Sequence, residues 1–305
     1  MNLKKLNDIP PWDWPENAET IVIETLTNRN ASKEDRLLAA ELAGDYTILS
    51  EKIASMLLSI VSSKEEPSAL RSKAAISLGP GLEEADTGDY DDPSDPPALS
   101  MAFVQNMQRT LHNLYSDADV PKEVRRSILE ASVRNPQAWH EGAIRSAYDS
   151  KDEEWLLSAA FCMRYVKGFN SQILEALKSS NPDVRYHAVN AAGNWEIDAA
   201  WPYVARLVTS AKTDKPMLLA AIKAAALIRP HETEIIEPHV DSYDEDISET
   251  AMEALSEAGF ITGLDSDDYE DDEDDEEDDD FEDDEEDFDE EEDEDEDDED
   301  DEENR

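Results

Sequence analysis

The chain has 305 residues, of which 78 are acidic and 26 basic, and its formal net charge is −52. Residues 265–305 hold 35 of the acidic residues and one arginine, which leaves 43 acidic and 25 basic residues, a net charge of −18, for residues 1–264. This balance disfavours direct binding of DNA or RNA, because phosphate contacts rely on basic surface.

A single cysteine excludes an intramolecular disulfide framework. The first 15 residues lack the apolar core of a secretory signal, and no apolar run approaches the roughly 18 residues of a membrane span. We therefore expect a cytoplasmic protein that makes no membrane contact.

The first notable segment is Pro10-Pro11-Trp12-Asp13-Trp14-Pro15, which lies ahead of the first predicted helix. Trp12 and Trp14 have two interpretations. They could cover the apolar end that the first unit of a helical array must close. They could also anchor a protein partner, because tryptophan is enriched at interface hot spots.

From residue 16 onward the sequence repeats. The clearest unit is residues 181–193, in which Pro182 is placed to open a helix and Gly193 to end it. The Arg185 position recurs with spacings of 35, 54, 31, 29, 33 and 30 residues, and the residue three places later is alanine in six of seven units. The seven repeated positions are Arg36, Arg71, Arg125, Leu156, Arg185, Leu218 and Ser248.

Each of these predicted helices follows another amphipathic stretch. The seven stretches are residues 16–28, 47–61, 98–115, 137–149, 171–179, 199–210 and 232–241. A period of this length is typical of stacked helical pairs that share one continuous core. We therefore predict an all-α fold, a solenoid of about seven helical pairs over residues 1–264, and a monomer.

The one long spacing implies an insertion of roughly 20 residues. Residues 79–100 fit this insertion, since they contain seven acidic residues and no basic residue, with four prolines and three glycines. We expect an acidic loop that projects from the array. No calcium-binding frame can be drawn through it.

The C-terminal segment, residues 265–305, has a charge density that prevents core formation, so it is predicted to be a disordered acidic tail. Tyr269, Phe281 and Phe288 are spaced through it and add apolar contact to a polyanion. We interpret the tail as shielding or competing for the basic surfaces of other proteins. The alternative is that its charge only keeps the protein soluble.

The second helix of each unit resembles the short bacterial form of the HEAT repeat. Asp183-Val184-Arg185, followed by Ala188, Ala191, Ala192 and Gly193, is the best match, and partial matches surround Arg71 and Arg125. The resemblance covers about residues 15–260. It implies a right-handed solenoid whose second helices line a concave surface that holds other proteins.

Arg36, Arg71, Arg125 and Arg185 share one phase of the repeat, so they would form a ladder in a stacked array. One interpretation is a basic stripe that binds a carboxylate-rich segment of a partner or of the protein's own tail. The other is that these arginines bond carboxylates and carbonyls of neighbouring turns, as the family's arginine tends to do.

Catalytic motifs are not evident in the sequence. Some HEAT-type hydroxylases carry iron on His-Glu dipeptides directly before the small-residue column, and no His-Glu pair stands there in this chain. Cys162 occupies a position that is alanine in four sister units, which indicates a buried small residue rather than a catalytic thiol. We therefore predict no metal and no cofactor, and a non-enzymatic scaffold or adaptor that binds protein partners, some of them basic. The alternative is a HEAT-like enzyme or enzyme subunit of the lyase or hydroxylase type.

Overall fold

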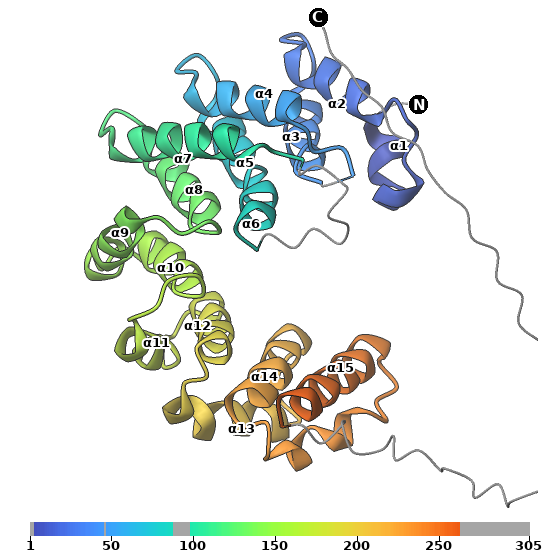
Figure 1. Cartoon of the computed structure of the whole chain (residues 1–305), viewed down its shortest axis with the longest axis vertical. Helices are drawn as coiled ribbons and strands as arrows, with labels where there is room; N and C mark the ends of the chain where they lie inside the picture. Colours follow the sequence, from blue (N-terminus) through green and yellow to red (C-terminus); the bar gives the residue numbers. More distant parts are fainter. Residues whose placement is uncertain (1–2, 46, 88–97, 263–305) are drawn as a thin grey trace, which may run out of the picture. The chain divides into compact units, whose positions relative to one another are not determined.

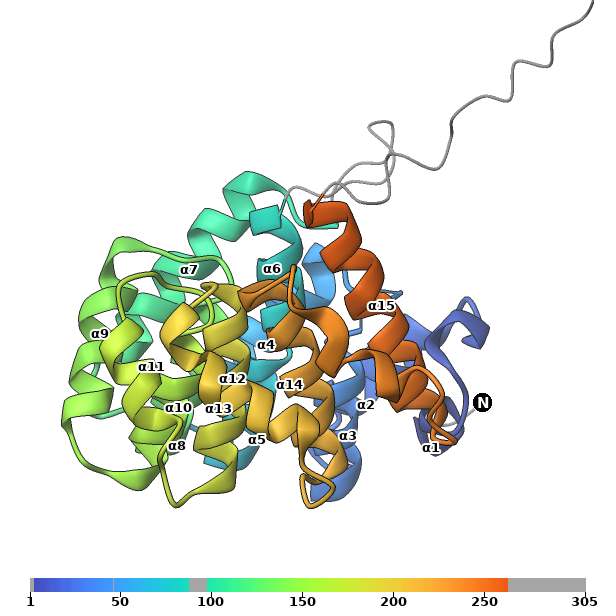
Figure 2. The same cartoon turned by 90° about the horizontal axis from the view of Figure 1, so that it is seen from below.

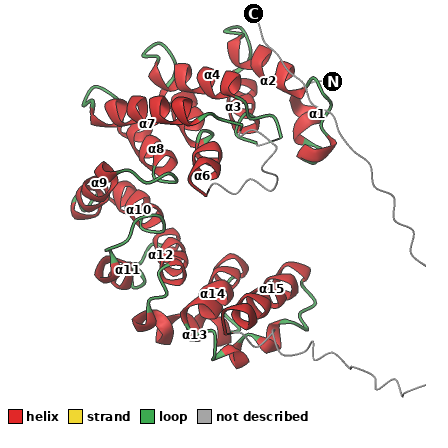
Figure 3. Ribbon diagram, viewed as in Figure 1, coloured by secondary structure: helices red, strands yellow, loops and turns green. Residues whose placement is uncertain are grey.

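The computed structural model describes residues 3–45, 47–87 and 98–262, which belong to a unit that spans residues 1–266. All regular secondary structure in these residues is helical (Figure 1, Figure 3), so the predicted all-α solenoid is confirmed. The predicted acidic tail, with Tyr269, Phe281 and Phe288, lies outside the described residues.

The second helices of the pairs begin in strict register with the sequence repeat. They are α3 (Lys33–Leu42), α5 (Ser68–Ile76), α8 (Lys122–Ser132), α10 (Glu153–Cys162), α12 (Pro182–Asn194), α14 (Lys215–Ile228) and α15 (Glu245–Thr262). In all seven, the repeated position is the fourth residue of the helix. Capping chemistry fixes these starts, because Ser32, Asp152, Asn181 and Asp214 accept hydrogen bonds from backbone N–H groups of the first turn.

The first helices match the predicted stretches in six pairs. They are α2 (Ala18–Thr27), α4 (Glu51–Ser62), α7 (Met101–Ser116), α9 (Ala138–Asp149), α11 (Asn170–Ala176) and α13 (Trp201–Thr209). In the seventh pair the expected helix over 232–241 is wrong: two 3₁₀ turns, η3 (Thr233–Ile235) and η4 (Glu237–His239), stand there instead. Pro238 accounts for the break, because it cannot donate the backbone hydrogen bond that a continuing helix needs.

The second helices form a continuous layer. Each packs against the second helix of the next pair, from α3 to α15, whereas the first helices contact chiefly their own pair (Figure 1). In all seven second helices, the residues one and five places after the repeated position are not buried. We call the surface that these residues form the open face. Its residues are Leu37, Ser72, Arg126, Leu157, Tyr186, Leu219 and Glu249 in one column and Glu41, Ile76, Glu130, Phe161, Asn190, Lys223 and Glu253 in the other.

The core runs the length of the row as two clusters of buried residues that meet inside α8, at Ile128 and Leu129. Small residues let the second helices approach closely. At Gly193 an added Cβ would lie 2.8 Å from the Cα of Ala224, so α12 and α14 can meet there only because the position has no side chain. No helix in the described ranges has both the length and the apolar character needed to cross a bilayer.

The predicted projecting loop over 79–100 is wrong in its first half. Residues 79–87 form helix α6 (Gly79–Thr87), which packs against α7 and α8. Figure 2 shows α6 next to α7. Leu78 and Leu82 are fully buried in the core, and this apolar burial offsets the low helix propensity of Gly79, Pro80 and Gly81. Residues 88–97 of the insertion lie outside the described part of the chain.

Candidate binding surfaces

The in-phase arginines are engaged within the fold. Arg36 donates through Nε and Nη2 to the Leu26 carbonyl, at 3.2 and 3.0 Å, and holds Glu66 with two bonds of 2.7 and 2.9 Å. Arg71 donates from Nε to the Val61 carbonyl at 2.9 Å and is almost fully buried. Leu26 and Val61 lie in the last turns of α2 and α4, where carbonyls lack intrahelical partners.

The same position has the same role in other pairs. Arg185 donates to the Ser179 and Ser180 carbonyls just after α11, at 2.8 and 3.0 Å. Ser248 donates to the Val240 carbonyl after η4 at 2.6 Å. Arg125 instead lies over the rings of Tyr115 and Trp155, with 5.7 and 5.6 Å to the ring centroids. These four arginines therefore join each first helix, or the rings near it, to the second helix, which are internal contacts of the kind that the second interpretation of the ladder describes.

The structure separates the two N-terminal tryptophans. The Trp14 indole N–H donates to the Leu6 carbonyl at 2.9 Å, and its ring packs against the core of the first pairs. Trp12, in the short helix η1 (Pro11–Asp13), is 79% exposed. Trp14 is thus engaged with the core, as the cap interpretation requires, whereas the exposed Trp12 ring leaves the anchor interpretation open.

Ion pairs tie successive pairs together at the starts of the second helices. Lys122 bonds Asp152 and Glu154 of the next pair, both at 2.6 Å. Lys215, at the equivalent position, bonds Asp244 and Asp246 at 2.6 and 2.5 Å. These contacts have a structural role, since they link adjacent second helices.

A different group of charges occupies the middle of the open face. Arg126 and Glu130 stand four residues apart on α8, with 3.7 Å between Nη2 and Oε1. Arg126 also reaches Glu154 at 3.4 Å and donates to the Ser158 hydroxyl at 2.9 Å, while that hydroxyl donates to Glu130. Arg134, another four residues on, bonds Glu83 of α6 at 2.6 Å. We call Glu83, Arg126, Glu130, Arg134 and Ser158, with the rings described next, the central cluster.

Aromatic and histidine rings from α10, the turn after it, and α12 complete the central cluster. Phe161 lies 5.6 Å from the Arg134 guanidinium and 5.4 Å from the His187 ring. Tyr165 packs 5.5 Å from Phe161, and its hydroxyl faces Glu83 at 3.4 Å. Three consecutive pairs therefore contribute half-buried rings and charges to one surface.

Burial shifts the titration of several groups here. It raises the pKa of Glu130 above its ordinary value, although the Ser158 hydrogen bond and the nearby Arg126 and Arg134 act in the opposite direction. It lowers the pKa of His187 to about 4, with Arg164 contributing in the same direction. The Cys162 thiol, fully buried as predicted, has its pKa raised well above the ordinary value by burial. Such shifts cluster at functional sites more often than elsewhere.

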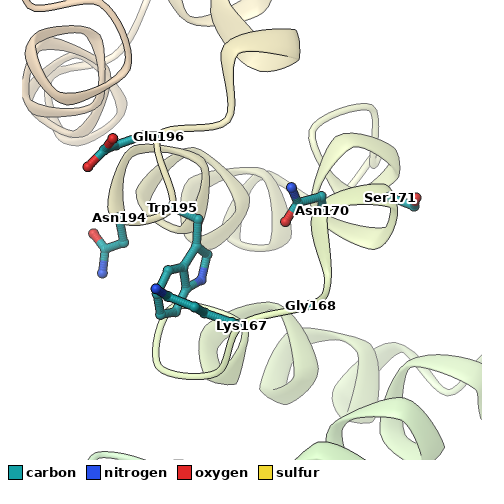
Figure 4. A pocket seen from close by; sticks show the side chains of 7 residues that line it. All are labelled: Lys167, Gly168, Asn170, Ser171, Asn194, Trp195 and Glu196. Atoms are coloured by element: carbon teal, nitrogen blue, oxygen red, sulfur yellow. The ribbon is translucent and has the colours of Figure 1, made fainter.

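A hollow of about 600 Å³ lies between the turn before α11 and the end of α12 (Figure 4). It is lined by Lys167, Gly168, Asn170, Ser171, Asn194, Trp195 and Glu196. The Lys167 ammonium lies 5.3 Å from the centre of the Trp195 ring, and the indole N–H donates to the Met163 carbonyl at 2.6 Å. Because the protein's own groups already engage the indole, we assign no ligand to this hollow.

The sequence contained one signal for the central cluster. Arg126 and Glu130 stand four residues apart on one face of α8, and Arg134 follows at the same spacing in the turn after the helix. Their partners Ser158 and Glu83 come from other helices, and Glu83 belongs to a segment predicted to be a loop. Within the described ranges no group of three His, Cys, Asp or Glu side chains could hold a metal ion.

Comparisons with known proteins give weak similarities. No protein-family model matches the sequence, and no curated protein is similar to it in sequence. Human deoxyhypusine hydroxylase, solved with glycerol, is similar in structure with 15% identity and a TM-score of 0.37, over 85% of this chain and 88% of that one. The complex of CpcE and CpcF of phycocyanin lyase from Nostoc has 16% identity and a TM-score of 0.42, over 82% of this chain and 98% of that one.

These findings correct one prediction. The sequence predicted a chain that is not an enzyme, whereas the two similar structures are named for a hydroxylase and for a lyase. We therefore withdraw the non-enzymatic assignment. At such identities and scores the similarity transfers no activity, substrate or cofactor to this chain.

Proposed function

We propose that this chain is a HEAT-type repeat protein that binds a polypeptide partner on its open face, centred on the central cluster, as an adaptor or as the partner-binding subunit of an enzyme. The observation that carries the proposal is the concentration of half-buried charges and rings on α8, α10 and α12. A fold-level resemblance alone would not identify a binding surface.

Stacking does not require these charges. At the Glu130 position of the repeat, the neighbouring units carry Ile76 and Phe161, and α12 carries Asn190. All of these helices stack in the same layer. A partly buried carboxylate loses hydration, and an apolar residue of similar volume is often equally stable. The retained charge in the middle of the row therefore supports a role in recognition.

The composition of the cluster favours a polypeptide as the ligand. Arginine and tyrosine are enriched at protein interfaces and often dominate their binding energy. The surface spreads over three successive pairs, which suits an extended chain or a helix better than a small molecule, whose sites are usually enclosed.

The test compares two charge-balanced double variants. Arg126→Gln with Glu130→Gln removes one charge of each sign from the central cluster. Lys223→Gln with Glu253→Gln does the same at another ion pair of the open face, 3.3 Å long. Affinity purification from the native source is carried out with the intact chain and with each double variant, and the recovered proteins are quantified by mass spectrometry. We expect a partner that the intact chain and the Lys223/Glu253 variant recover equally. The Arg126/Glu130 variant should recover at least tenfold less of it.

Circular dichroism must first show that both variants keep the helical content and melting behaviour of the intact chain. Equal recovery of every partner by all three proteins would contradict the proposal. A catalytic protein among the depleted partners would assign the chain to an enzyme assembly, and a non-catalytic one would make it an adaptor.

A further inference from the structure

The N-terminal turn presents an aromatic side chain that the fold does not use. Trp12 is 79% exposed, although burying a side chain of this size would be strongly favourable. Its neighbour Trp14 is fixed by indole hydrogen bonds to the Leu6 and Ile9 carbonyls, at 2.9 and 3.3 Å. The turn between them is closed by backbone bonds from Asp13 to Pro10 and from Trp14 to Pro11. Trp12 is thus held outward by a rigid frame.

A hollow of about 520 Å³ adjoins the Trp12 ring. Prolines 11 and 15 and the side chains of Ile48 and Leu49 supply its apolar wall, and Glu16 and Glu19 supply its charge. Its lining contains no basic residue. Lys52 pairs with Glu19 at 3.3 Å, whereas Glu16 and the adjacent Asp13 are exposed and form no ion pair within the described part of the chain.

We propose that this Trp12 surface, made of Trp12, Asp13, Glu16 and the adjoining hollow, binds an arginine-bearing basic segment of a partner protein. A guanidinium would stack on the indole face, since tryptophan is the best aromatic partner for a cation. Its N–H groups would bond the carboxylates of Asp13 and Glu16, and the aliphatic part of its side chain would lie against the proline and aliphatic wall.

Charge complementarity selects this occupant. The described unit belongs to a part of the chain with a net charge of −18, so an acidic partner segment would be repelled on approach, whereas a basic one would be attracted. The Trp12 surface lies on the first helical pair and shares no residue with the central cluster, so its test is independent of the proposed function above.

The experiment follows the tryptophan indole N–H signals of the full ¹⁵N-labelled chain by NMR while an oligo-arginine peptide is added. The Trp12 signal is identified by its loss in Trp12→Phe. We expect a saturable shift of that signal, weakened when the salt concentration rises from 0.1 M to 1 M, where the Debye length falls from about 10 Å to about 3 Å. A site-resolved signal is needed because the acidic tail can also bind the peptide.

Two matched comparisons decide the result. Asp13→Asn with Glu16→Gln should weaken the peptide's effect on Trp12 by about 2- to 5-fold, the size expected for exposed charge contacts. Glu234→Gln with Glu237→Gln, which removes the same charge elsewhere, should leave it unchanged. An oligo-citrulline peptide, which has the same shape without charge, should not shift the signal. The proposal is overturned if the Trp12 signal does not move, if citrulline moves it equally, or if both double variants behave alike.

Discussion

The repeated position shows how single side chains hold a helical pair together. A helix ends with carbonyls that have no partner and with the negative end of its dipole, so a cationic donor is suited to that place. Arg36, Arg71 and Arg185 fill this role with guanidinium groups, and Ser248 fills it with a hydroxyl. The common feature is a donor directed at the end of the preceding element, which Ser248 supplies without a charge.

Replacing Arg36 with glutamine should lower the free energy of unfolding by about 2–4 kcal/mol, because it breaks a charged cap and leaves the nearly buried Glu66 carboxylate unpaired. The neighbouring pair Arg29–Glu65 is a matched control, since its side chains are 74% and 75% exposed. Arg29→Gln should change the stability by about 0–0.5 kcal/mol. Urea denaturation of both variants measures this, and equal losses would contradict the capping role.

His140 is a second residue with a measurable consequence. It is fully buried at the start of α9, where Nδ1 accepts from the Gln137 backbone N–H at 2.8 Å and Nε2 lies 2.9 Å from the Ser132 hydroxyl. This arrangement needs a neutral ring with its proton on Nε2. Burial accordingly lowers the pKa of His140 from 6.5 to about 4.

The folded chain therefore takes up the His140 proton at a lower pH than the unfolded chain. The contribution of the neutral His140 ring to the free energy of unfolding is therefore complete above pH 6.5. It is lost as the pH falls toward about 4, which lowers the free energy of unfolding by up to about 3 kcal/mol. NMR titration of the imidazole signal, assigned with His140→Gln, should give a midpoint near 4. A midpoint near 6.5 would show that the ring is accessible to water in the folded state.

Residue roles were only partly predictable from the sequence. The phase of the arginines and the burial of Cys162 follow from the repeat, because equivalent positions have equivalent surroundings. The partners do not, since Arg36 bonds a carbonyl ten residues before it and a carboxylate thirty residues after it. The central cluster was missed for the same reason, as it joins α6, α8, α10 and α12.

At the scale of helices, close approach between α12 and α14 depends on one glycine. Gly193→Ala should destabilise the chain by about 1–3 kcal/mol, because the new Cβ would meet backbone and Cβ atoms of Ala224 at 2.8 and 3.0 Å. At Gly142, inside α9, an added Cβ would have no neighbouring atom within 4 Å. Gly142→Ala should therefore stabilise the chain by about 0.5–1 kcal/mol.

Thermal and urea denaturation of the two alanine variants distinguish packing from propensity. Opposite signs are expected, since the substitution is the same and only the surroundings differ. Stabilisation by both would contradict the close approach of α12 and α14 at Gly193.

Helix positions could be predicted from the sequence where they follow the repeat. Outside the repeat the predictions were wrong. The starts of all seven second helices follow from one periodic position. Helix α6 lies in the insertion, where Gly79, Pro80 and Gly81 indicate a loop and where burial of Leu82 overrides that signal. The prediction of a first helix in the seventh pair was also wrong, because its apolar spacing indicated a helix and Pro238 interrupts it.

At the scale of the whole molecule, Ala258 in α15 is the last buried core residue among the side chains that the structure describes, which end at residue 259. Truncation after Leu264 should therefore change the melting temperature by only a few degrees, or raise it, because residues 265–305 add 34 net negative charges to an already acidic chain. Circular dichroism melting of full and truncated chains at low salt measures this. A cooperative loss of helical signal on truncation would show that the segment contributes to the folded core.

The ion pairs of Lys122 and Lys215 have a mechanical consequence. Each joins a second helix only to the next one, at 2.5–2.6 Å, and core contacts likewise run mainly between neighbours. A force that pulls on the two ends is then borne by these junctions in series. Under tension the contacts between neighbouring helical pairs would separate one after another, beginning with the weakest, and would form again when the force is removed.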